Sequence, residues 1–292
     1  MSQRKLKFAL FGNIYQTKKS AAIQKVLSCL SEYGAVLSVD QEYFDFLHDD
    51  QHIDVPAARV FAGDDFEADF AISMGGDGTF LKTAARVGSR NIPILGLNMG
   101  RLGFLADIAP QDIESCLRAL HEDDYAVESR AVVQVSLSDE LKGFALNDVA
   151  ILKRDTASMI SIRTTINGEY LSTYQADGLI VSTPTGSTAY SLSNGGPIIV
   201  PGTGVLVMTA VAPHSLNIRP IVIPDSAVVT LDVESRSHSF LVAVDGRSEK
   251  CAEGTRITLR RAPYNVQVVK RSGKQYFSTL REKMMWGADV RE

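Results

Sequence analysis

Four consecutive residues, Gly75-Gly76-Asp77-Gly78, form the motif in the sequence that most clearly indicates a functional site. They follow an apolar run at residues 70–74 and open onto residues 79–87, which are patterned as a helix. Glycines let the backbone approach a ligand and adopt positive φ, and a helix N-terminus offers N–H groups to an anion. The tetrad therefore predicts a phosphate-binding turn. Asp77 itself repels phosphate, so it must hold a metal ion, accept a proton or cap the helix.

Two common phosphate-binding motifs are missing from the sequence. No segment fits G-x-x-x-x-G-K-[ST], so a P-loop is excluded. Residues 76–81 lack the third glycine of G-x-G-x-x-G, so the Rossmann dinucleotide fingerprint is not met either.

A second polar segment lies at residues 176–197, where a short strand pattern runs into hydroxyl side chains and glycines. Such a segment cannot form a core by itself, but its backbone and hydroxyl donors suit a polar ligand. Tyr190 offers a ring face for stacking. The alternatives are an ordinary Ser/Thr/Gly loop and a Tyr190 that belongs to the core.

Together these segments resemble the NAD kinase family. The matching segments, in the order of the family, are Gly75–Thr79, 98–105, Asn147-Asp148, 176–178, 183–190, 213–216 with Arg219-Pro220, and 244–246. The Gly-Gly-Asp-Gly element is shared with diacylglycerol-type lipid kinases and phosphofructokinases. The block Thr-Pro-Thr-Gly-Ser-Thr-Ala-Tyr at 183–190 is much more particular to NAD kinases.

The resemblance implies transfer of the γ-phosphoryl group of ATP to the 2′-hydroxyl of the adenosine ribose of NAD. That hydroxyl is a poor nucleophile, so the reaction needs positioning, charge neutralisation and a proton acceptor. By resemblance, Asp77 is the general base or aligns the hydroxyl, and Mg²⁺ is required, with no protein metal ligands assigned. The binding residues that the resemblance implies are Gly75, Gly76, Gly78, Thr79, Asn147, Asp148, Asp177, Thr188, Ala189, Tyr190, Ser193 and Asp245.

Several of these residues also have simpler interpretations. Asn147 and Asp148 suit ribose hydroxyls but could form a strand-end turn. Asp177 is placed to accept from an amino group of the dinucleotide, and Asp245 matches a family site residue, yet both precede a glycine as turn residues do. The chain departs from the family at Asp148, where Glu is usual, and at Gln175, where many bacterial relatives carry a basic residue.

The hydrophobic patterning predicts an N-terminal Rossmann-like α/β domain. Strands are expected at 6–11, 36–39, 70–74 and 92–96, and helices at 18–33, 79–87 and around 113–120. Residues 41–54 are polar and acidic, and we expect them to form a surface excursion.

Beyond about residue 127 the pattern changes to many short strands, which predicts a C-terminal β-sandwich domain. Asn167-Gly168 between two strand patterns predicts a hairpin. Residues 277–286 are patterned as a helix, and in the family the C-terminal segment returns to the first domain. We therefore expect an α/β domain of residues 1–126 plus 263–292 and an all-β NAD-binding domain of residues 127–262.

Bulk properties narrow the function further. The chain has 292 residues, a formal charge of −4 and no basic stripe, so nucleic acid is not an expected partner. Its three cysteines are widely spaced and form no C-x-x-C, which indicates a cytoplasmic protein. The apolar run at 205–211 is too short to span a membrane. Relatives are usually homodimers or homotetramers, so a homo-oligomer is expected.

Two rival functions stay open on the sequence alone. A lipid or sugar kinase could use the same glycine tetrad, but an acyl cleft or a membrane-facing surface is not visible. A non-enzymatic NAD(H)-binding sensor could keep the pocket, but the intact Asp77 argues against it.

Overall fold

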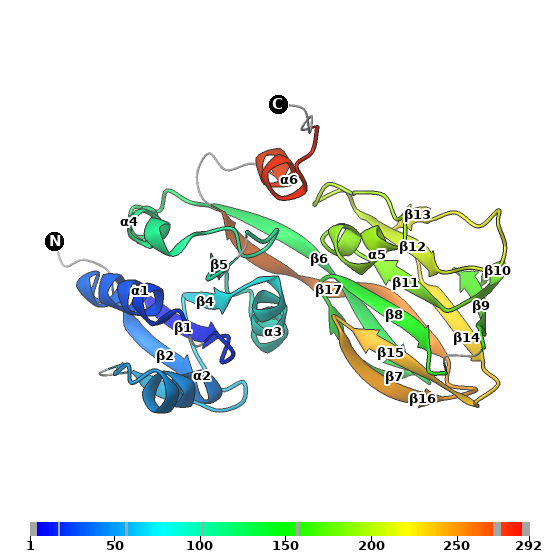
Figure 1. Cartoon of the computed structure of the whole chain (residues 1–292), viewed down its shortest axis with the longest axis horizontal. Helices are drawn as coiled ribbons and strands as arrows, with labels where there is room; N and C mark the ends of the chain where they lie inside the picture. Colours follow the sequence, from blue (N-terminus) through cyan, green and yellow to red (C-terminus); the bar gives the residue numbers. More distant parts are fainter. Residues whose placement is uncertain are drawn as a thin grey trace. The chain divides into compact units, whose positions relative to one another are not determined.

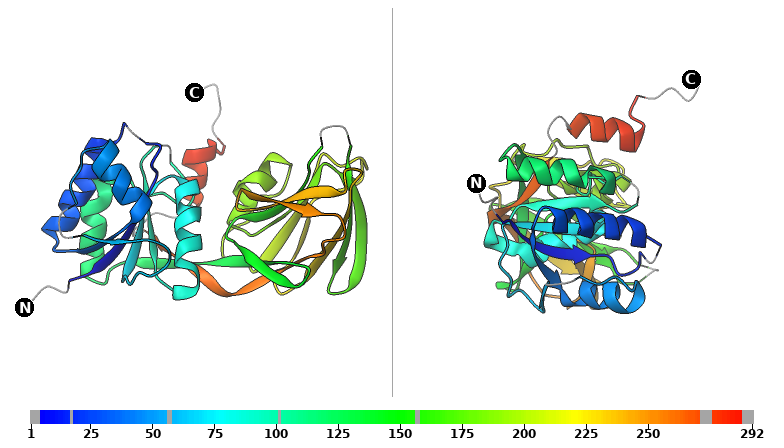
Figure 2. Two further views of the ribbon diagram at one scale, coloured as in Figure 1. Left: turned by 90° about the horizontal axis from the view of Figure 1, so that it is seen from below. Right: turned by 90° about the vertical axis from the view of Figure 1, so that its left-hand side faces the viewer.

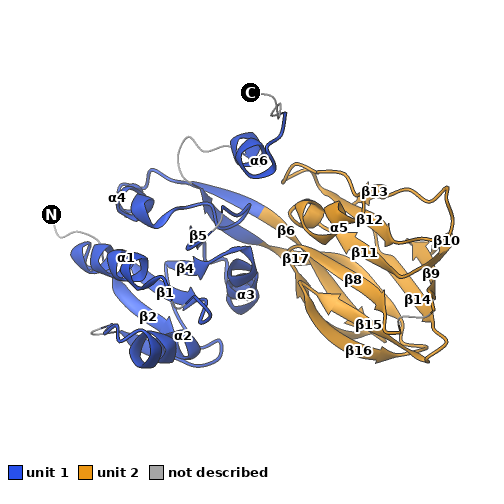
Figure 3. Cartoon of the chain, in the orientation of Figure 1, with its two compact units in different colours: residues 1–129, 266–292 blue, residues 130–265 orange. Residues whose placement is uncertain are grey.

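The structure is a computed structural model that describes residues 5–16, 18–55, 58–100, 102–155, 158–270 and 276–287. The chain divides into two compact units, which Figure 3 colours separately. Unit 1 contains residues 1–129 and 266–292, and unit 2 contains residues 130–265. Two long strands, β6 (Ala126–Leu137) and β17 (Ile257–Lys270), each contribute residues to both units.

Unit 1 is built on a parallel sheet with the order β17-β5-β4-β1-β2-β3. Its own strands are β1 (Lys7–Gly12), β2 (Val36–Asp40), β3 (Arg59–Phe61), β4 (Phe70–Gly75) and β5 (Ile94–Asn98). Its helices are α1 (Ser20–Glu32), α2 (Gln41–Asp45), α3 (Asp77–Val87), α4 (Ile113–His121) and α6 (Tyr276–Met284), with short turns η1 (Phe46–Asp50), η2 (Gly88–Arg90) and η3 (Pro110–Asp112). The expected α/β domain is present.

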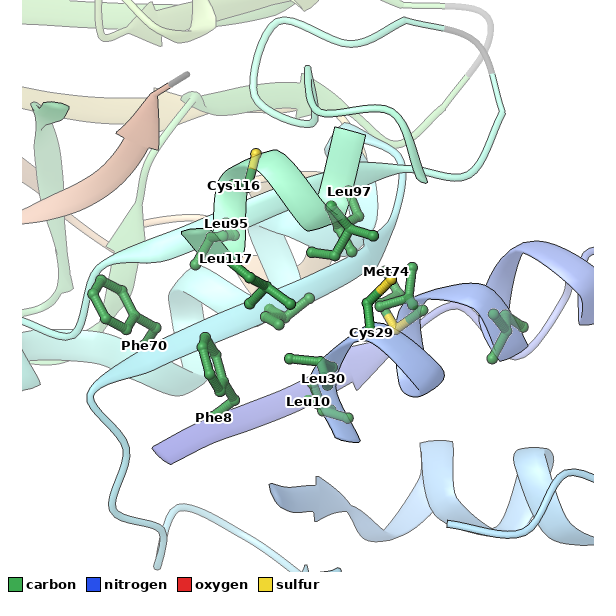
Figure 4. Packing of buried hydrophobic residues seen from close by; sticks show 14 of the residues in the cluster. Phe8, Leu10, Cys29, Leu30, Phe70, Met74, Leu95, Leu97, Cys116 and Leu117 are labelled. Carbon is green, nitrogen blue, oxygen red and sulfur yellow. The ribbon is translucent and has the colours of Figure 1, made fainter. Parts of the chain in front are cut away.

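Helices cover both faces of this sheet, with α1 and α4 on one side and α3 on the other (Figure 2). The core under α1 and α4 joins strand residues Phe8 and Leu10 to Leu30 and Leu117 of the helices (Figure 4). These side chains are buried because the apolar residues of α1 and α4 recur at helical spacing and therefore share one face.

The prediction of a surface excursion at residues 41–54 is wrong. This segment forms α2 and the π-helical turn η1, and Tyr43, Phe46 and Leu47 of these elements are buried in the same core. These apolar residues stand three and four positions apart and so share a helix face, although most of their neighbours are polar. The ring of Tyr43 packs where a Cβ on Gly12 would lie, which explains the glycine at the end of β1.

Unit 2 is a β-sandwich, as expected (Figure 1). One antiparallel sheet has the order β13-β12-β11-β8-β15-β16, and the other includes β10-β9-β14-β17 with β6 and β7. The bounds of the remaining strands are β7 (Glu140–Ala145), β8 (Asp148–Lys153), β9 (Ile160–Ile166), β10 (Glu169–Ala176), β11 (Gly178–Ser182), β12 (Val205–Val211), β13 (Ile221–Pro224), β14 (Val229–Glu234), β15 (Ser239–Val244) and β16 (Arg247–Ala252). Alternate residues of both sheets fill one core, including Ile151, Val181, Ile162 and Leu231.

The hairpin predicted at Asn167-Gly168 is confirmed. These two residues join β9 to β10, which pair antiparallel with Ile166 opposite Glu169. Both turn residues have positive φ, as a two-residue hairpin turn of this kind requires. Within the described part of the chain, none of the helices is long and apolar enough to cross a membrane.

Candidate active site

Strand β4 carries the glycine tetrad to the carboxyl end of the parallel sheet in unit 1. Every residue of β4 is buried between its neighbours β1 and β5, and Gly75 lies opposite Asn98 of β5. Helix α3 then begins at Asp77. The strand-turn-helix arrangement is therefore confirmed, and in open α/β sheets ligands bind outside this end of the strands.

The tetrad differs from the sequence expectation in two respects. The N-cap of α3 is Gly76 and no side chain caps the helix, so the capping role for Asp77 is wrong. Gly75, Gly76 and Gly78 all lack positive φ, so conformational strain does not explain them. Instead, a Cβ on Gly75 would overlap the side chain of Thr79, while the Cβ positions of Gly76 and Gly78 meet no described atom within 4 Å. The space beside these two glycines is open to a ligand.

The Asp77 carboxylate is held by the loop that follows β5. Its Oδ2 accepts a hydrogen bond from the backbone N–H of Phe104 at 2.9 Å. Its Oδ1 accepts from the N–H groups of Leu105 at 3.0 Å and Ala106 at 2.9 Å. Hydrogen bonds to an ionised acceptor are stronger than neutral ones, so these three donors fix the orientation of the carboxylate.

The loop depends on glycine where it meets Asp77. A Cβ on Gly103 would overlap Asp77 Oδ1, and a Cβ on Gly96 would press on the backbone of Leu105 and Ala106. The loop is tied back at its base, because Ile108 donates to the Gly96 carbonyl at 3.1 Å. Arg101 of the matching segment lies outside the described residues.

Lys283 of helix α6 is the fourth partner of Asp77. Its Nζ lies 3.3 Å from Asp77 Oδ2 and 4.5 Å from the ring centroid of Phe104. The two ion-paired side chains are each about a third exposed. Nothing in the local sequence of Lys283 indicates this contact, since 206 positions separate it from Asp77.

In unit 2, Asp245 holds the backbone of the Asn147-Asp148 pair. Its Oδ2 accepts from the N–H of Leu146 at 2.8 Å, and its Oδ1 accepts from Asn147 at 2.8 Å and Asp148 at 3.2 Å. Asp245 also occupies a tight turn between β15 and β16 with positive φ, as its simpler interpretation predicts. Asp245 can therefore form the turn and at the same time accept hydrogen bonds from the three backbone N–H groups.

Asp148 is a buried carboxyl group at the start of β8, with 7% of the residue exposed. Within the described residues, no hydrogen-bond donor lies on this carboxyl group. Burial raises its pKa to about 7, and the nearby negative charge of Asp245 adds to the rise. Burial also raises the pKa of Asp245, against the three backbone N–H groups that lower it. Asp148 is thus a titratable group near neutral pH beside the amide of Asn147.

The hydroxyl-rich segment packs directly on this pair. Thr183 donates its N–H to the carbonyl of Asn147 at 2.9 Å and its hydroxyl to the carbonyl of Leu146 at 2.6 Å. A Cβ on Gly186 would overlap the backbone of Asn147. Residues 146–148 and 182–186 therefore form one rigid substructure, a role for Thr183 and Gly186 that sequence reasoning missed.

Tyr190 begins the short helix α5 (Tyr190–Ser193), which follows the turn η4 (Gly186–Thr188). Tyr190 is 39% exposed, so the interpretation of this tyrosine as a core residue is wrong. Thr188 and Ala189 are partly exposed and Ser193 is exposed, while Ser191 points inward and shares a 2.9 Å hydrogen bond with Thr209. The segment thus has a buried anchor and an accessible face.

Asp177 lies between β10 and β11 and forms an ion pair with Lys153, with Nζ and Oδ1 2.7 Å apart. The Lys153 side chain is 24% exposed and that of Asp177 is 33% exposed. Gln175 is exposed and donates to the hydroxyl of Ser161 at 3.0 Å. A cation therefore lies next to Asp177 although Gln175 is not basic, and no sequence motif indicates this ion pair.

The fold defines a class of protein: an α/β unit with a glycine-rich turn at the start of a helix, joined to a β-sandwich with hydroxyl-rich loops. Residues 24–125 match the family model described as the ATP-NAD kinase N-terminal domain, and residues 146–271 match the ATP-NAD kinase C-terminal domain.

Similar proteins agree with the family models. The chain is 57% identical to an NAD kinase of Bacteroides fragilis over 98% of this chain and 100% of that protein. It is 42% identical to an NAD kinase of Porphyromonas gingivalis over 98% and 99% of the two chains. The chain belongs to the NAD kinase family, and it is an enzyme of the phosphotransferase class.

Two solved structures share the fold. The crystal structure of yeast NADH kinase complexed with NADH has a TM-score of 0.90 at 21% identity and covers 99% of this chain and 90% of that one. An NAD kinase from Archaeoglobus fulgidus in complex with ATP has a TM-score of 0.75 at 24% identity and covers 96% and 99% of the two chains.

Proposed function

We propose that the protein transfers the γ-phosphoryl group of ATP to the 2′-hydroxyl of the adenosine ribose of NAD, with Asp77 as the general base. The family supports the reaction, because relatives named NAD kinase match this chain over nearly its full length. The observation that supports the role of Asp77 is the set of three hydrogen bonds that its carboxylate accepts from the backbone N–H groups of Phe104, Leu105 and Ala106. It fixes a carboxylate at the start of α3, beside glycines that leave room for phosphate.

The chemistry that this carboxylate performs is a single proton transfer. The 2′-oxygen forms a bond to the γ-phosphorus, the bond from that phosphorus to the bridging oxygen breaks, and ADP leaves. The hydroxyl proton passes to Asp77 and then to solvent. Because phosphoryl transfer depends on positioning and charge stabilisation, the base must be held in place before substrate arrives.

The NAD-binding residues belong to unit 2. We propose that Asn147 and Asp148 bind ribose hydroxyls, that Tyr190 stacks on the dinucleotide with Thr188, Ala189 and Ser193 beside it, and that Asp177 accepts from an amino group. Tyr190 and Ser193 are exposed and Asn147, Asp177, Thr188 and Ala189 are partly exposed, which supports their roles. Asp148 is buried, and its proposed role rests on its place next to Asn147. Asp245 contributes to NAD binding indirectly: its carboxylate holds the backbone of residues 146–148 and so positions Asn147 and Asp148.

The donor site comprises Gly75, Gly76, Gly78 and Thr79, whose backbone lies at the N-terminus of α3. Among the described residues, no three His, Cys, Asp or Glu side chains gather as a metal-binding cluster. Mg²⁺ often binds through substrate phosphates with only one or two carboxylates. The residues present therefore fit an Mg²⁺ ion that arrives with ATP, where it would neutralise phosphate charge.

We also propose a cytoplasmic homo-oligomer. The cysteines Cys29, Cys116 and Cys251 are buried and none of them forms a disulfide, as is usual for a protein of a reducing compartment. Size-exclusion chromatography with light scattering tests the assembly, and a monomer at micromolar concentration contradicts it.

The test of the proposed function is an NADP assay with the variant Asp77→Asn. With ATP, Mg²⁺ and NAD, the wild-type enzyme should form NADP, and the variant should lose about 10²- to 10⁴-fold in kcat. The amide nitrogen of Asn would face the donors Phe104 and Lys283, so the melting temperature and NAD affinity are measured alongside. Activity within a few-fold of wild type contradicts the role of Asp77, and absence of NADP from the wild-type reaction contradicts the function.

A further inference from the structure

Lys283 contacts the Asp77 carboxylate in the candidate active site, but the reaction as proposed above assigns it no role. It lies on α6, at the far end of the chain from the glycine tetrad. Its ammonium stands between the Asp77 carboxylate, 3.3 Å from Oδ2, and the Phe104 ring, 4.5 Å from the centroid. An ammonium over an aromatic face is attracted by the ring as well as by the carboxylate.

Four hydrogen-bond donors occupy the acceptor positions of the Asp77 carboxylate. An ionised carboxylate has about four acceptor positions, two on each oxygen. Oδ1 accepts from Leu105 and Ala106, and Oδ2 accepts from Phe104 and Lys283. The ribose hydroxyl must donate to one of these positions before its proton can transfer, so one donor has to leave.

Only Lys283 can leave without breaking the loop. The three N–H donors belong to consecutive backbone positions, and the loop that carries them packs on Gly96 and is tied back through Ile108. Lys283 contributes a single ammonium on a flexible four-carbon stem, and its hydrogen bond is the longest of the four. The acceptor position open to substrate is therefore the one that Lys283 occupies on Oδ2.

The displaced ammonium has a ready partner in the reaction. It stays beside the Phe104 ring and next to Asp77, whose neighbours in the chain, Gly76 and Gly78, have open space at their Cβ positions. Lysine binds phosphate as a point charge, and the transferring phosphoryl group brings negative charge to this place.

We propose that Lys283 is a positioning residue that holds Asp77 in the free enzyme and passes to a phosphate oxygen of the donor. The exchange opens Oδ2 to the ribose hydroxyl only when the donor is present. This inference rests on the proposed function, because it assigns an exchange of partners to the same carboxylate.

The test compares Lys283→Met, which keeps the length of the side chain without its charge, with Lys283→Arg in the full-length enzyme. Arg281→Met is the matched control, because Arg281 is an exposed cation on the same helix. The Met variant should lose about 10- to 100-fold in kcat/KM for ATP, the effect of one charge-assisted hydrogen bond. Lys283→Arg should recover most of that loss, and Arg281→Met should stay within about twofold of wild type.

A second readout separates positioning from simple support of the fold. In Lys283→Met the Oδ2 position is already open, so the calorimetric Kd for NAD should be unchanged or lower, with the melting temperature preserved. The inference is overturned if Lys283→Met keeps the wild-type kcat/KM for ATP, or if Lys283→Arg does not restore the lost kcat/KM. It is also overturned if the loss of activity in Lys283→Met is accompanied by weaker NAD binding and a lower melting temperature. If the wild-type enzyme forms NADP in each case, the proposed function stands and only the role of Lys283 fails.

Discussion

Replacing Asp148 by Asn should make the enzyme more stable above neutral pH. The carboxyl group is buried at the start of β8, and burial together with the charge of Asp245 raises its pKa to about 7. The variant Asp148→Asn has nearly the same shape and never ionises. At high pH the wild-type protein must therefore keep a buried charge that the variant lacks.

The size and sign of the effect follow from proton linkage. The pKa of Asp148 is about 7 in the folded protein, against 3.8 for an unperturbed aspartate. At 1.36 kcal/mol per unit, the shift corresponds to up to about 4 kcal/mol. Between these two pH values the folded state binds more protons than the unfolded state, so the wild-type free energy of unfolding falls as the pH rises. Below pH 4 the group makes no difference, and above pH 7 its full cost is present.

The assay is urea unfolding followed by circular dichroism at several pH values from 4 to 8.5. The difference in unfolding free energy between Asp148→Asn and wild type should grow with pH and level off above 7. Asp155→Asn is the control, because Asp155 is an exposed carboxylate of the same unit. A difference that does not vary with pH would refute the reasoning, as would an equal trend in the control. NAD affinity of the wild type should also rise through pH 7, since the ionised form is the better acceptor.

Three further substitutions test the geometry of the site. Tyr190→Ala should raise the KM for NAD while kcat changes little, because the loss of stacking costs about 1–3 kcal/mol of binding free energy. A strongly lowered melting temperature with an unchanged KM would contradict the proposed role of Tyr190. Asp245→Asn should weaken NAD binding measured by calorimetry, because its amide nitrogen meets backbone N–H donors; wild-type affinity would remove its positioning role. Gly103→Ala should abolish most NADP formation, because its Cβ overlaps Asp77 Oδ1, whereas Gly100→Ala has open space and should stay active; equal activity of the two variants would contradict the importance of the loop.

Local features of the fold could be predicted from the sequence. The tetrad between an apolar run and a helical pattern, and the turn at Asn167-Gly168, depend on neighbouring residues only, so their signals are present in the sequence. The packing of residues 41–54 could not be predicted, because the few apolar residues that anchor it, Tyr43 and Leu47 among them, are outnumbered by polar ones.

The contacts that define the candidate site could not be predicted in the same way. Asp77 finds its backbone partners 27 to 29 positions away, and Asp245 finds its partners 97 to 99 positions away. Backbone N–H groups carry no residue identity, so a carboxylate that binds them leaves no pattern in the side chains. The glycine at Gly103 is the one local trace of such a contact, because it marks a backbone that must pass close to another group.

Asp77 and Asp245 use the same device in different units, and the comparison shows what sets the proposed catalytic residue apart. Each carboxylate accepts hydrogen bonds from three consecutive backbone N–H groups, which orients a loop and the carboxylate together. At Asp245 the described donors are all backbone groups, so the carboxylate serves to hold Asn147 and Asp148. At Asp77 the fourth donor is the side-chain ammonium of Lys283, which leaves Oδ2 in the exchange that we propose. An aspartate clasped by backbone is a structural anchor, and it becomes available for chemistry where one of its partners is a side chain that can move away.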